Sequence, residues 1–422
     1  MVPNGWNRIA LEKIAEVRSG VAKGKKGLKA PIEVPYLRVA NVQDGHVDLT
    51  EVKTIEIEQD KLERYSLKYG DVLMNEGGDY DKLGRGDVWL GQIEPCLHQN
   101  HVFAVRPNQD IVDSFFLAAL AASNYGKTYF LSCAKRSTNL ASINSTQIKE
   151  FPVLVPPLPE QKKIAQILST WDKAIATTEK LIATSQQQKK ALMQQLLTGK
   201  KRLVNPKTGK AFEGDWEEVK LGELGKTFTG LTGKTKDDFG KGKQYVPYIN
   251  IFKNSAVDMN ALELVKINNG ENQNTVQYGD IFFTTSSETP EEVGMSSVML
   301  NQTKESIYLN SFCFGFRPHD MQQLLPGFAQ YLLRGTQVRR SISILAQGAT
   351  RYNLSKTQLL KIELKLPSLE EQQKIASVLT AADKEIELLQ AKLAHLKDEK
   401  KALMQQLLTG KRRVKVDENV AA

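Results

Sequence analysis

The sequence predicts a mixed α/β protein in which two similar domains alternate with two long helices. The helices are expected to pair as an antiparallel coiled coil, so that the chain forms a pseudo-two-fold internal repeat. The first observation is a string, KKALMQQLLTGK, that occurs at 189–200 and again at 400–411. Upstream of it the two copies align without a gap, at an offset of 211 residues. Agreement of this length does not arise by chance and indicates a duplication.

The second observation is the period of each copy, which predicts one long helix. Seam residues recur in alternating steps of four and three, an average of 3.5 that is typical of a left-handed coiled coil. The seam consists of Ile164, Leu168, Trp171, Ile175, Thr178, Ile182, Ser185, Lys189, Leu192 and Leu196, and of Ile375, Leu379, Ala382, Ile386, Leu389, Leu393, Leu396, Lys400, Leu403 and Leu407. About 40 helical residues would span roughly 60 Å. A single core helix packed on its own domain is the alternative, but two equal stripes in one chain favour pairing.

The ends of both helices carry signals of their own. Pro157 marks the start of the first helix, and Ser368 with Glu371 predicts a capping box at the start of the second. Gly199 and Gly410 follow the last turns, where a glycine commonly ends a helix.

The order of the segments predicts how the helices pair. A large segment precedes each helix, and the end of the first helix leads through the second large segment to the start of the second helix. The start of the second helix is therefore expected near the end of the first, which makes the helices antiparallel. The expected divisions are 1–155 for the first domain, 156–203 for the first helix, 204–365 for the second domain, 366–412 for the second helix and 413–422 for a tail.

The two large segments share short islands of similar sequence. The matching pairs are 35–37 with 247–249, 69–72 with 278–281, 103–107 with 314–318, and 146–148 with 357–359. The islands are mostly apolar with turn residues at their edges, which predicts short strands and the turns between them. Between the islands the halves diverge, so one frame is expected to carry two different sets of loops. Such loops usually carry specificity.

Composition limits the class of protein and of partner. The 422 residues are 41% hydrophobic and 25% charged, which is ordinary for a globular protein with two or three domains. The longest apolar run, 115–122, is too short to cross a membrane, and 1–13 has no apolar signal core. Three widely spaced cysteines fit a reducing cytosol, so we expect a cytoplasmic protein. The net charge of +9 favours a polyanionic partner, although a basic but otherwise ordinary protein is the alternative.

The sequence offers no convincing catalytic or metal motif. The stretch 230–235 suggests a P-loop, but only two residues separate its glycines where the motif needs four. Cys96, His98 and His101 lie close together, yet residues three apart do not share a face of a strand. No metal site and no catalytic residue is predicted, and this favours a binding protein.

The string 157–165, PLPEQKKIA, followed by a long helix ending in LLTGK, resembles the conserved region of type I restriction–modification specificity subunits. The stretch 369–376 with its own helix resembles the same region again, so the resemblance covers the whole chain. It implies two target-recognition domains, each reading one half of a bipartite DNA site, with helices that set the spacing. It also implies that the chain has no catalysis of its own.

The resemblance further implies partners and cofactors outside this chain. Two modification subunits would dock on the helices and form an adenine methyltransferase that uses S-adenosylmethionine. Restriction subunits would add a nuclease that depends on ATP and Mg²⁺. Two other classes remain open: a coiled-coil scaffold that binds only proteins, and a self-contained DNA-modifying enzyme.

Two sets of residues are candidates for contact with double-stranded DNA. Basic residues in loops and turns are candidates for phosphate contact: Lys23, Lys25, Lys26, Lys135, Arg136, Lys234, Lys236, Arg339 and Arg340. Groups in loops or at strand ends are candidates for contact with base edges: Asn75, His98, Asn100, Asn139, Ser286, Ser287, Arg351, Tyr352 and Asn353.

Overall fold

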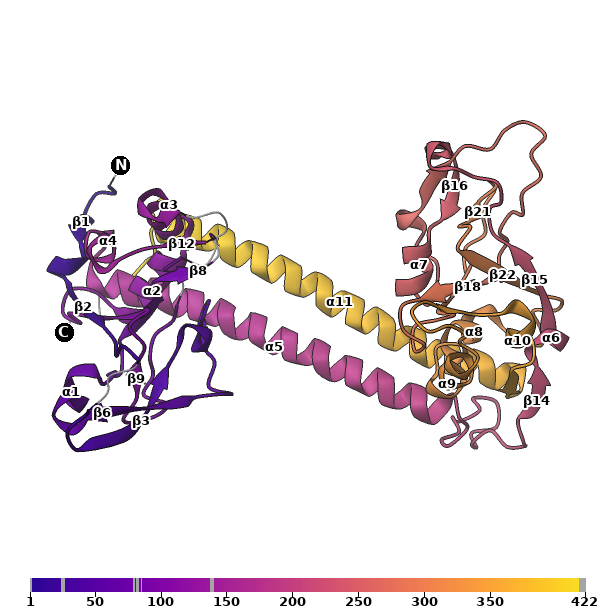
Figure 1. The fold of residues 1–422 in the computed structure, drawn as a ribbon, viewed down its shortest axis with the longest axis horizontal. Helices are drawn as coiled ribbons and strands as arrows, with labels where there is room; N and C mark the ends of the chain where they lie inside the picture. Colours follow the sequence, from indigo (N-terminus) through magenta and orange to yellow (C-terminus); the bar gives the residue numbers. More distant parts are fainter. Residues whose placement is uncertain are drawn as a thin grey trace. The chain divides into compact units, whose positions relative to one another are not determined.

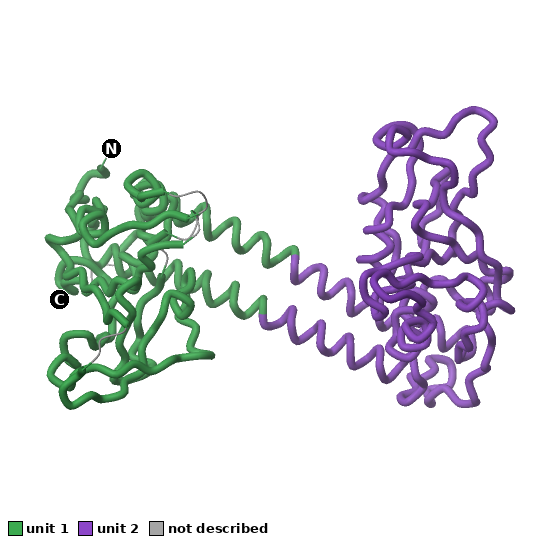
Figure 2. The backbone as a smooth tube through the Cα atoms, in the orientation of Figure 1, with its two compact units in different colours: residues 1–179, 391–422 green, residues 180–390 purple. Residues whose placement is uncertain are grey.

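The computed structural model describes residues 2–23, 27–78, 80, 83–84, 86–136 and 140–416. The chain forms two compact units (Figure 2). Unit 1 comprises 1–179 with 391–422, and unit 2 comprises 180–390. Each unit holds one mixed α/β domain and a part of both long helices. The boundary between the units therefore falls inside the helices.

The two long helices are α5, Leu158–Leu196, and α11, Leu369–Leu407, each of 39 residues (Figure 1). Every predicted seam residue is buried or half-buried, which confirms the 3.5-residue period. Gly199 and Gly410 follow the last turns with φ of 68° and 66°, a region that favours glycine. The predicted C-terminal ends of both helices are confirmed.

Within each unit, α5 and α11 run antiparallel. In unit 1, Asp172 pairs with Lys400, and Glu179 pairs with Lys397 at 2.8 Å, so rising numbers on α5 meet falling numbers on α11. In unit 2, Lys189 pairs with Asp383. Lys189 and Lys400 are the matching seam lysines of the two copies, and their aspartates match as well. A charged pair at a seam position favours one register of a coiled coil over others.

The domain of unit 1 precedes α5. Its elements are β1 Asn7–Ala10, β2 Ala15–Ser19, β3 Pro31–Leu37, β4 Val42–Gln43, β5 His46–Val47, β6 Lys53–Glu58, α1 Leu62–Tyr65, β7 Val72–Asn75, β8 Gly77–Gly78, β9 Leu97–His98, β10 Val102–Pro107, α2 Ser114–Ala122, α3 Asn124–Cys133, β11 Lys135–Arg136, β12 Ala141–Ser142, α4 Ser145–Lys149 and β13 Pro152–Val155. One core joins β7 and β10 to α2, α3 and the ends of α5 and α11.

The domain of unit 2 lies between the long helices in sequence. Its elements are β14 Glu217–Lys220, α6 Leu221–Leu224, β15 Gly225–Thr229, β16 Phe239–Val246, α7 Tyr248–Lys253, β17 Glu263–Val265, β18 Ile281–Thr284, β19 Ser286–Ser287, β20 Ser296–Val298, β21 Tyr308–Leu309, β22 Cys313–Pro318, α8 Pro326–Leu332, α9 Thr336–Ile344, β23 Tyr352–Asn353, α10 Lys356–Leu359 and β24 Glu363–Leu366. Its main core packs β18 and β22 against α8 and both long helices.

The two domains share one frame. The sheet β2-β10-β7 matches β15-β22-β18, the pair β1-β13 matches β14-β24, and the parallel pair β3-β9 matches β16-β21. The matched islands explain part of this frame. Asp71 accepts two hydrogen bonds of 2.7 Å from Arg106, and Asp280 accepts bonds of 2.8 and 2.7 Å from Arg317. Each fully buried carboxylate thus joins two islands by a bidentate ion pair.

Three islands that were expected to form strands and turns form short helices. Residues 247–249 begin α7, 146–148 lie in α4, and 357–359 lie in α10. Asn144 caps α4 by accepting a hydrogen bond of 3.0 Å from the backbone N–H of Gln147. Ile148 and Leu359 are fully buried. Helices of four to six residues are too short to show a period, and tertiary packing decides their conformation.

A buried glutamate near the start of each long helix forms what we name an end clamp. In unit 1, Glu160 accepts hydrogen bonds of 2.6 and 2.7 Å from Arg413, whose guanidinium lies 5.7 Å from the ring centre of Trp6. In unit 2, Glu371 accepts bonds of 2.7 and 2.8 Å from Arg202. Arg202 lies over the Trp216 ring, 6.0 Å from its centre.

The end clamp of unit 2 corrects one prediction. The capping box expected the carboxylate of Glu371 to bind the backbone N–H of Ser368, but that carboxylate binds Arg202. Only the other half of the box forms, because Ser368 Oγ accepts a hydrogen bond of 3.4 Å from the Glu371 N–H. The segments that follow α5 and α11 therefore each supply an arginine to a clamp.

Candidate nucleic-acid interface

In unit 1, three short strands bring distant loops together. β8 pairs with β12, and β12 pairs with β11. Gly77 lies close to the neighbouring strand, since a Cβ there would come within 3.2 Å of the Ala141 carbonyl oxygen. We name β8, β11 and β12 the domain 1 edge. A hollow of about 560 Å³ lies against it, lined in part by His101, Lys135 and Arg136.

The exposed chemistry of the domain 1 edge is mainly basic. Lys135 and Arg136 are exposed. The Arg136 guanidinium lies 5.8 Å from the ring centre of Tyr80 and donates a hydrogen bond of 3.1 Å to the Leu131 carbonyl. Such a planar cation, supported by an aromatic ring, suits contact with a phosphate or with the acceptor edge of guanine.

In unit 2, β19 pairs with β23, and we name this pair the domain 2 edge. Arg351 Nε donates a hydrogen bond of 3.2 Å to Ser286 Oγ, and the Tyr248 hydroxyl donates one of 2.8 Å to the Ser286 carbonyl. Arg351 and Asn353 are exposed, while Ser286 is buried. The edge therefore presents a guanidinium and an amide to solvent, and the buried Ser286 accepts the hydrogen bond that positions the guanidinium.

The two edges occupy equivalent places in the shared frame. β8 and β19 each follow the strand that ends the common sheet, and β12 and β23 each precede the short helix α4 or α10. The side chains differ: Gly-Gly faces Ala-Ser in domain 1, and Ser-Ser faces Tyr-Asn in domain 2. The same backbone thus carries two different sets of hydrogen-bonding groups.

The other candidates are distributed as follows. Lys23, Lys236 and Arg340 are exposed, and the Lys23 ammonium lies 5.7 Å from the ring centre of Tyr36. Asn100 and Tyr352 are half-buried, and Ser287 donates a hydrogen bond of 3.1 Å to Glu292. The candidates outside the described residues are Lys25, Lys26 and Asn139.

Asn75 and Lys234 are corrections to the predicted site. Asn75 is fully buried on β7, where its amide donates a hydrogen bond of 2.8 Å to the Val42 carbonyl, so it cannot reach a base edge. The Lys234 side chain is 3% exposed and pairs with Glu271 at 2.6 Å. This bond is the main reason why the pKa of Glu271 is lowered to about 2. Lys234 therefore holds its loop rather than a phosphate.

Arg339 is a third correction, and it has a neighbour that the sequence reasoning missed. Arg339 donates hydrogen bonds of 2.6 to 2.8 Å to the carbonyls of Glu291, Val293 and Gly294. Arg334 donates hydrogen bonds of 2.7 to 3.1 Å to the carbonyls of Ser296, Ile251, Phe252 and Asn254. Burial lowers the pKa of both arginines to about 10, so both stay charged at neutral pH. They hold the segment between β19 and β20 and the end of α7.

His98 is the fourth correction. Its ring is buried, and Nδ1 donates a hydrogen bond to the Val102 carbonyl. Burial is the main cause that lowers the pKa of His98 to about 4 from 6.5. The ring is therefore neutral in the folded domain and cannot contact a base. The matching position in unit 2 is Leu309, which pairs with β16 as His98 pairs with β3.

We expect His98→Leu to remove the pH dependence that His98 gives to unit 1 and that Leu309 cannot give to unit 2. Between pH 6.5 and 4 the unfolded His98 binds a proton and the folded one does not, so stability is lost as the pH falls through this window. The loss at pH 4 is on the order of 3 kcal/mol. Hydrogen exchange of β10 amides at pH 4 to 7 measures it, with β22 of unit 2 as the internal control. An equal loss in His98→Leu would contradict this role.

Two observations on absences apply to the described part of the chain. No group of three or more His, Cys, Asp or Glu side chains there is arranged to hold a metal ion. None of the described helices combines the length and the apolar character needed to cross a bilayer.

Comparison with known proteins gives one consistent result. The family model described as type I restriction modification DNA specificity domain matches residues 3–185 and 213–398. A putative type I restriction enzyme MjaX specificity subunit from Methanocaldococcus jannaschii is 30% identical over 98% of this chain and 95% of its own length. The MjaVIII specificity subunit of the same organism is 26% identical, over 98% and 94%. The fold is similar to that of the HsdS subunit from Thermoanaerobacter tengcongensis, with a TM-score of 0.54, 18% identity, and coverage of 97% and 98%.

Proposed function

Because the chain belongs to the family of type I restriction–modification DNA specificity proteins, we propose that it recognises a bipartite, asymmetric site in double-stranded DNA. The domain 1 edge reads one half of the site and the domain 2 edge reads the other. The observation that supports this proposal is the equivalence of the two edges in one frame, with different exposed side chains. Two domains with the same frame can approach the DNA duplex in the same way. Different side chains on the two edges can then contact different base sequences.

The proposal includes partners that supply the chemistry. Two modification subunits dock on the chain and transfer a methyl group from S-adenosylmethionine to adenine, and restriction subunits use ATP and Mg²⁺ to cleave DNA. The chain itself holds no cofactor and performs no catalysis, and it acts in the cytoplasm, where the DNA is. The long helices set the distance between the half-sites. Adenine methylation by the pure chain alone would contradict this assignment of roles. Absence of any sequence-specific DNA binding would favour the alternative of a coiled-coil scaffold that binds only proteins.

Replacing one arginine on each edge tests the proposal. We expect Arg136→Ala and Arg351→Ala each to weaken specific DNA binding by about 10- to 100-fold, equivalent to about 1–3 kcal/mol. Each variant should relax one half-site and leave the other unchanged, because each arginine belongs to one edge. Site selection from a randomised DNA pool, with the modification subunit present, measures both effects.

A matched control is available within unit 1. Arg64 on α1 is exposed and lies 5.5 Å from the ring centre of Tyr65, an arrangement like that of Arg136 over Tyr80. Arg64→Ala should leave the selected site and the affinity unchanged. If Arg136→Ala and Arg351→Ala relax the same half-site, or if neither has more effect than Arg64→Ala, the edges are not the readers.

A further inference from the structure

Unit 1 contains a cavity of about 560 Å³ whose lining comes from α2 and from both long helices, and we name it the α2 cavity. On the α2 side the lining includes three small residues: Ala118, Ala119 and Ala122. On the side of the long helices it includes three polar residues: Ser169, Asp172 and Lys400. The α2 cavity therefore joins a wall of alanines to a wall that carries charge.

The duplication identifies the counterpart of the α2 cavity in unit 2. The same glutamine of each long helix, Gln161 or Gln372, accepts a hydrogen bond of 2.8 or 3.0 Å from the backbone N–H just before α2 or α8. The helices α2 and α8 therefore occupy the same place in the shared frame. The sixth residue of α2 is Ala119, and the sixth residue of α8 is Tyr331. A tyrosine of unit 2 is thus replaced by an alanine in unit 1.

Tyr331 shows what this place in the frame accommodates. It is 3% exposed, and its hydroxyl donates a hydrogen bond of 2.7 Å to Asp383 Oδ2. The same hydroxyl lies 3.2 Å from Thr380 Oγ1. Lys189 Nζ lies 5.5 Å from the centre of the ring and pairs with Asp383 Oδ1. The long helices therefore hold the phenol by a carboxylate, a hydroxyl and a cation.

These three partners have counterparts in the lining of the α2 cavity, although the tyrosine does not. At the offset of 211 residues, Thr380, Asp383 and Lys189 correspond to Ser169, Asp172 and Lys400. Lys400 pairs with Asp172 Oδ1, the same oxygen that the lysine of unit 2 uses. Within the described part of the chain, Asp172 Oδ2 accepts no hydrogen bond. Unit 1 thus keeps the partners of a phenol around the space that the ring would fill.

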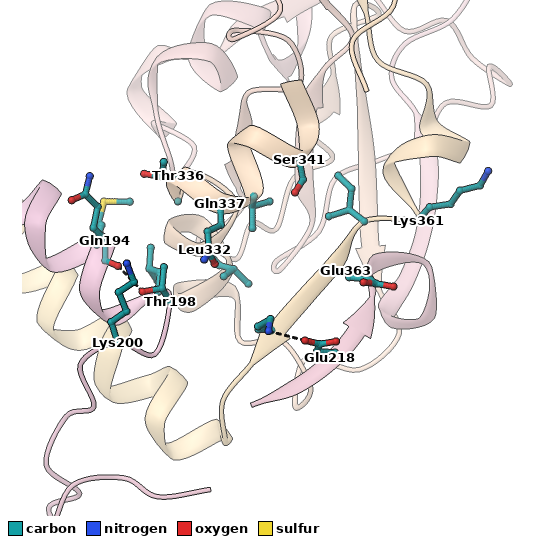
Figure 3. A pocket seen from close by; sticks show the side chains of 16 residues that line it. Gln194, Thr198, Lys200, Glu218, Leu332, Thr336, Gln337, Ser341, Lys361 and Glu363 are labelled. Carbon is teal, nitrogen blue, oxygen red and sulfur yellow. Dashed lines mark hydrogen bonds and ion pairs between the residues drawn. The ribbon is translucent and has the colours of Figure 1, made fainter. Parts of the chain in front are cut away.

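A different cavity of unit 2, of about 590 Å³, does not correspond to the α2 cavity. Figure 3 shows it with Gln194 on one side and Thr336 on the other. It reaches Leu332 on α8, but Tyr331 is not part of its lining. In unit 2 the place of the α2 cavity is therefore occupied by the Tyr331 side chain itself.

A second difference between the units indicates the charge of a ligand. Ala122 of the α2 cavity corresponds to Arg334 of unit 2, so a guanidinium is missing from unit 1. Asp87 lines the α2 cavity, and its carboxylate forms no ion pair with any residue that the structure describes. The other acids of the lining, Asp44 and Asp172, each pair with a lysine. Burial is the main cause that raises the pKa of Asp87, and a cation bound beside it would offset that cost.

We infer that the α2 cavity is a binding site for a small phenolic amine. The ring takes the place that Tyr331 fills in unit 2, its hydroxyl donates to Asp172 Oδ2, and Lys400 lies against its face. The amine pairs with Asp87. The bound ring joins α2 to α5 as Tyr331 joins α8 to α11, so the ligand stabilises unit 1 by mass action. The site is separate from both edges and does not depend on the proposed function.

Calorimetric titration of the full chain with four probes tests the chemistry of the ligand. Tyramine carries the ring, the hydroxyl and the amine. Phenol lacks the amine, phenethylamine lacks the hydroxyl, and 3-(4-hydroxyphenyl)propionate carries an acid in place of the amine. We expect one tyramine site, with the other three probes weaker by about tenfold or more, equivalent to one lost charged or polar contact. Tyramine should also slow the hydrogen exchange of α2 amides.

Two substitutions test the location of the site. Ala119→Tyr supplies the side chain of unit 2 and should abolish tyramine binding. Ala176→Tyr is the matched control, because residue 176 is exposed on α5 outside the lining, and binding should persist. Tyr331→Ala opens the equivalent space in unit 2 and should raise the number of phenol sites from one to two. This variant keeps the test valid if Ala119→Tyr does not fold.

Four outcomes would overturn the inference. Absence of saturable binding by tyramine and phenol would leave the α2 cavity to a side chain of another protein. Unchanged binding in Ala119→Tyr, or protection of the cavity in Figure 3 in place of α2, would locate the ligand elsewhere. Equal binding of tyramine and phenol would mean that Asp87 holds no amine. Tighter binding of the acid than of tyramine would mean that the exposed Lys401 of the lining selects an anion.

Discussion

Glu371→Ala is expected to lower the free energy of unfolding of unit 2 by about 3 kcal/mol, as for removal of one partner from a buried ion pair. Glu371 is 1% exposed and binds both donors of Arg202, whose side chain is 24% exposed. Without the carboxylate, a half-buried guanidinium remains against the ring of Trp216 with no counter-charge. The contact that fixes Arg202, beyond the end of α5, to the start of α11 is lost as well. Hydrogen exchange of β22 amides, with β10 as a reference, measures the loss.

Two further variants check this result. Glu370→Ala is the matched control, because Glu370 pairs with Lys207 in an exposed ion pair, 53% and 73% exposed, and such pairs contribute little. Glu160→Ala should lower the free energy of unfolding of unit 1 instead, because Arg413 pairs with Glu160 there as Arg202 pairs with Glu371 in unit 2. If Glu371→Ala costs no more than Glu370→Ala, the end clamp does not stabilise the unit.

One heptad inserted into each long helix, after Ile182 and after Leu393, is expected to change the preferred gap between the half-sites. Seven residues preserve the 3.5-residue seam, so the pair should still form. The helices lengthen by about 10 Å, close to three base pairs at about 3.4 Å each. Three base pairs also rotate the duplex by roughly 100°, given about 10.5 pairs per turn. The variant should therefore select a gap longer by two or three pairs or lose tight binding.

The insertion is informative because α5 and α11 each contribute to both units. A single insertion in α5 alone shifts its seam against α11 and should disrupt the pairing of Lys189 with Asp383, which makes it a useful negative control. Site selection with the doubly inserted chain gives the answer. Recovery of the original half-sites at the original gap, bound as tightly as before, would mean that the helices do not set the spacing.

The long helices were predictable from the sequence because their period extends over 39 residues and occurs twice. The end clamps were missed although their signal was present. Glu160 matches Glu371 and Arg202 matches Arg413 at the same offset of 211 residues, yet no local pattern joins an arginine beyond a helix to a glutamate at the start of the other. Only the antiparallel pairing brings them together.

The candidate interface was partly predictable, for similar reasons. Arg136 and Arg351 stand beside Gly-rich or polar turns, and they are exposed as expected. Burial of Lys234 depends on Glu271, 37 residues away, and no pattern in the sequence indicates that contact. Asn75 did carry a local warning, because it ends an apolar strand with no turn residue before it. Sequence therefore locates the loops, but packing decides which polar side chains of each loop reach solvent.

The central claim is that the two domains read DNA independently, and exchange of one domain tests it most directly. Residues 1–155 are replaced by the first domain of another family member, and the site methylated with the modification subunit is determined by sequencing. The account predicts that one half-site changes to that of the donor, while the other half-site and the gap stay the same. A change in both half-sites, or in neither, would contradict it.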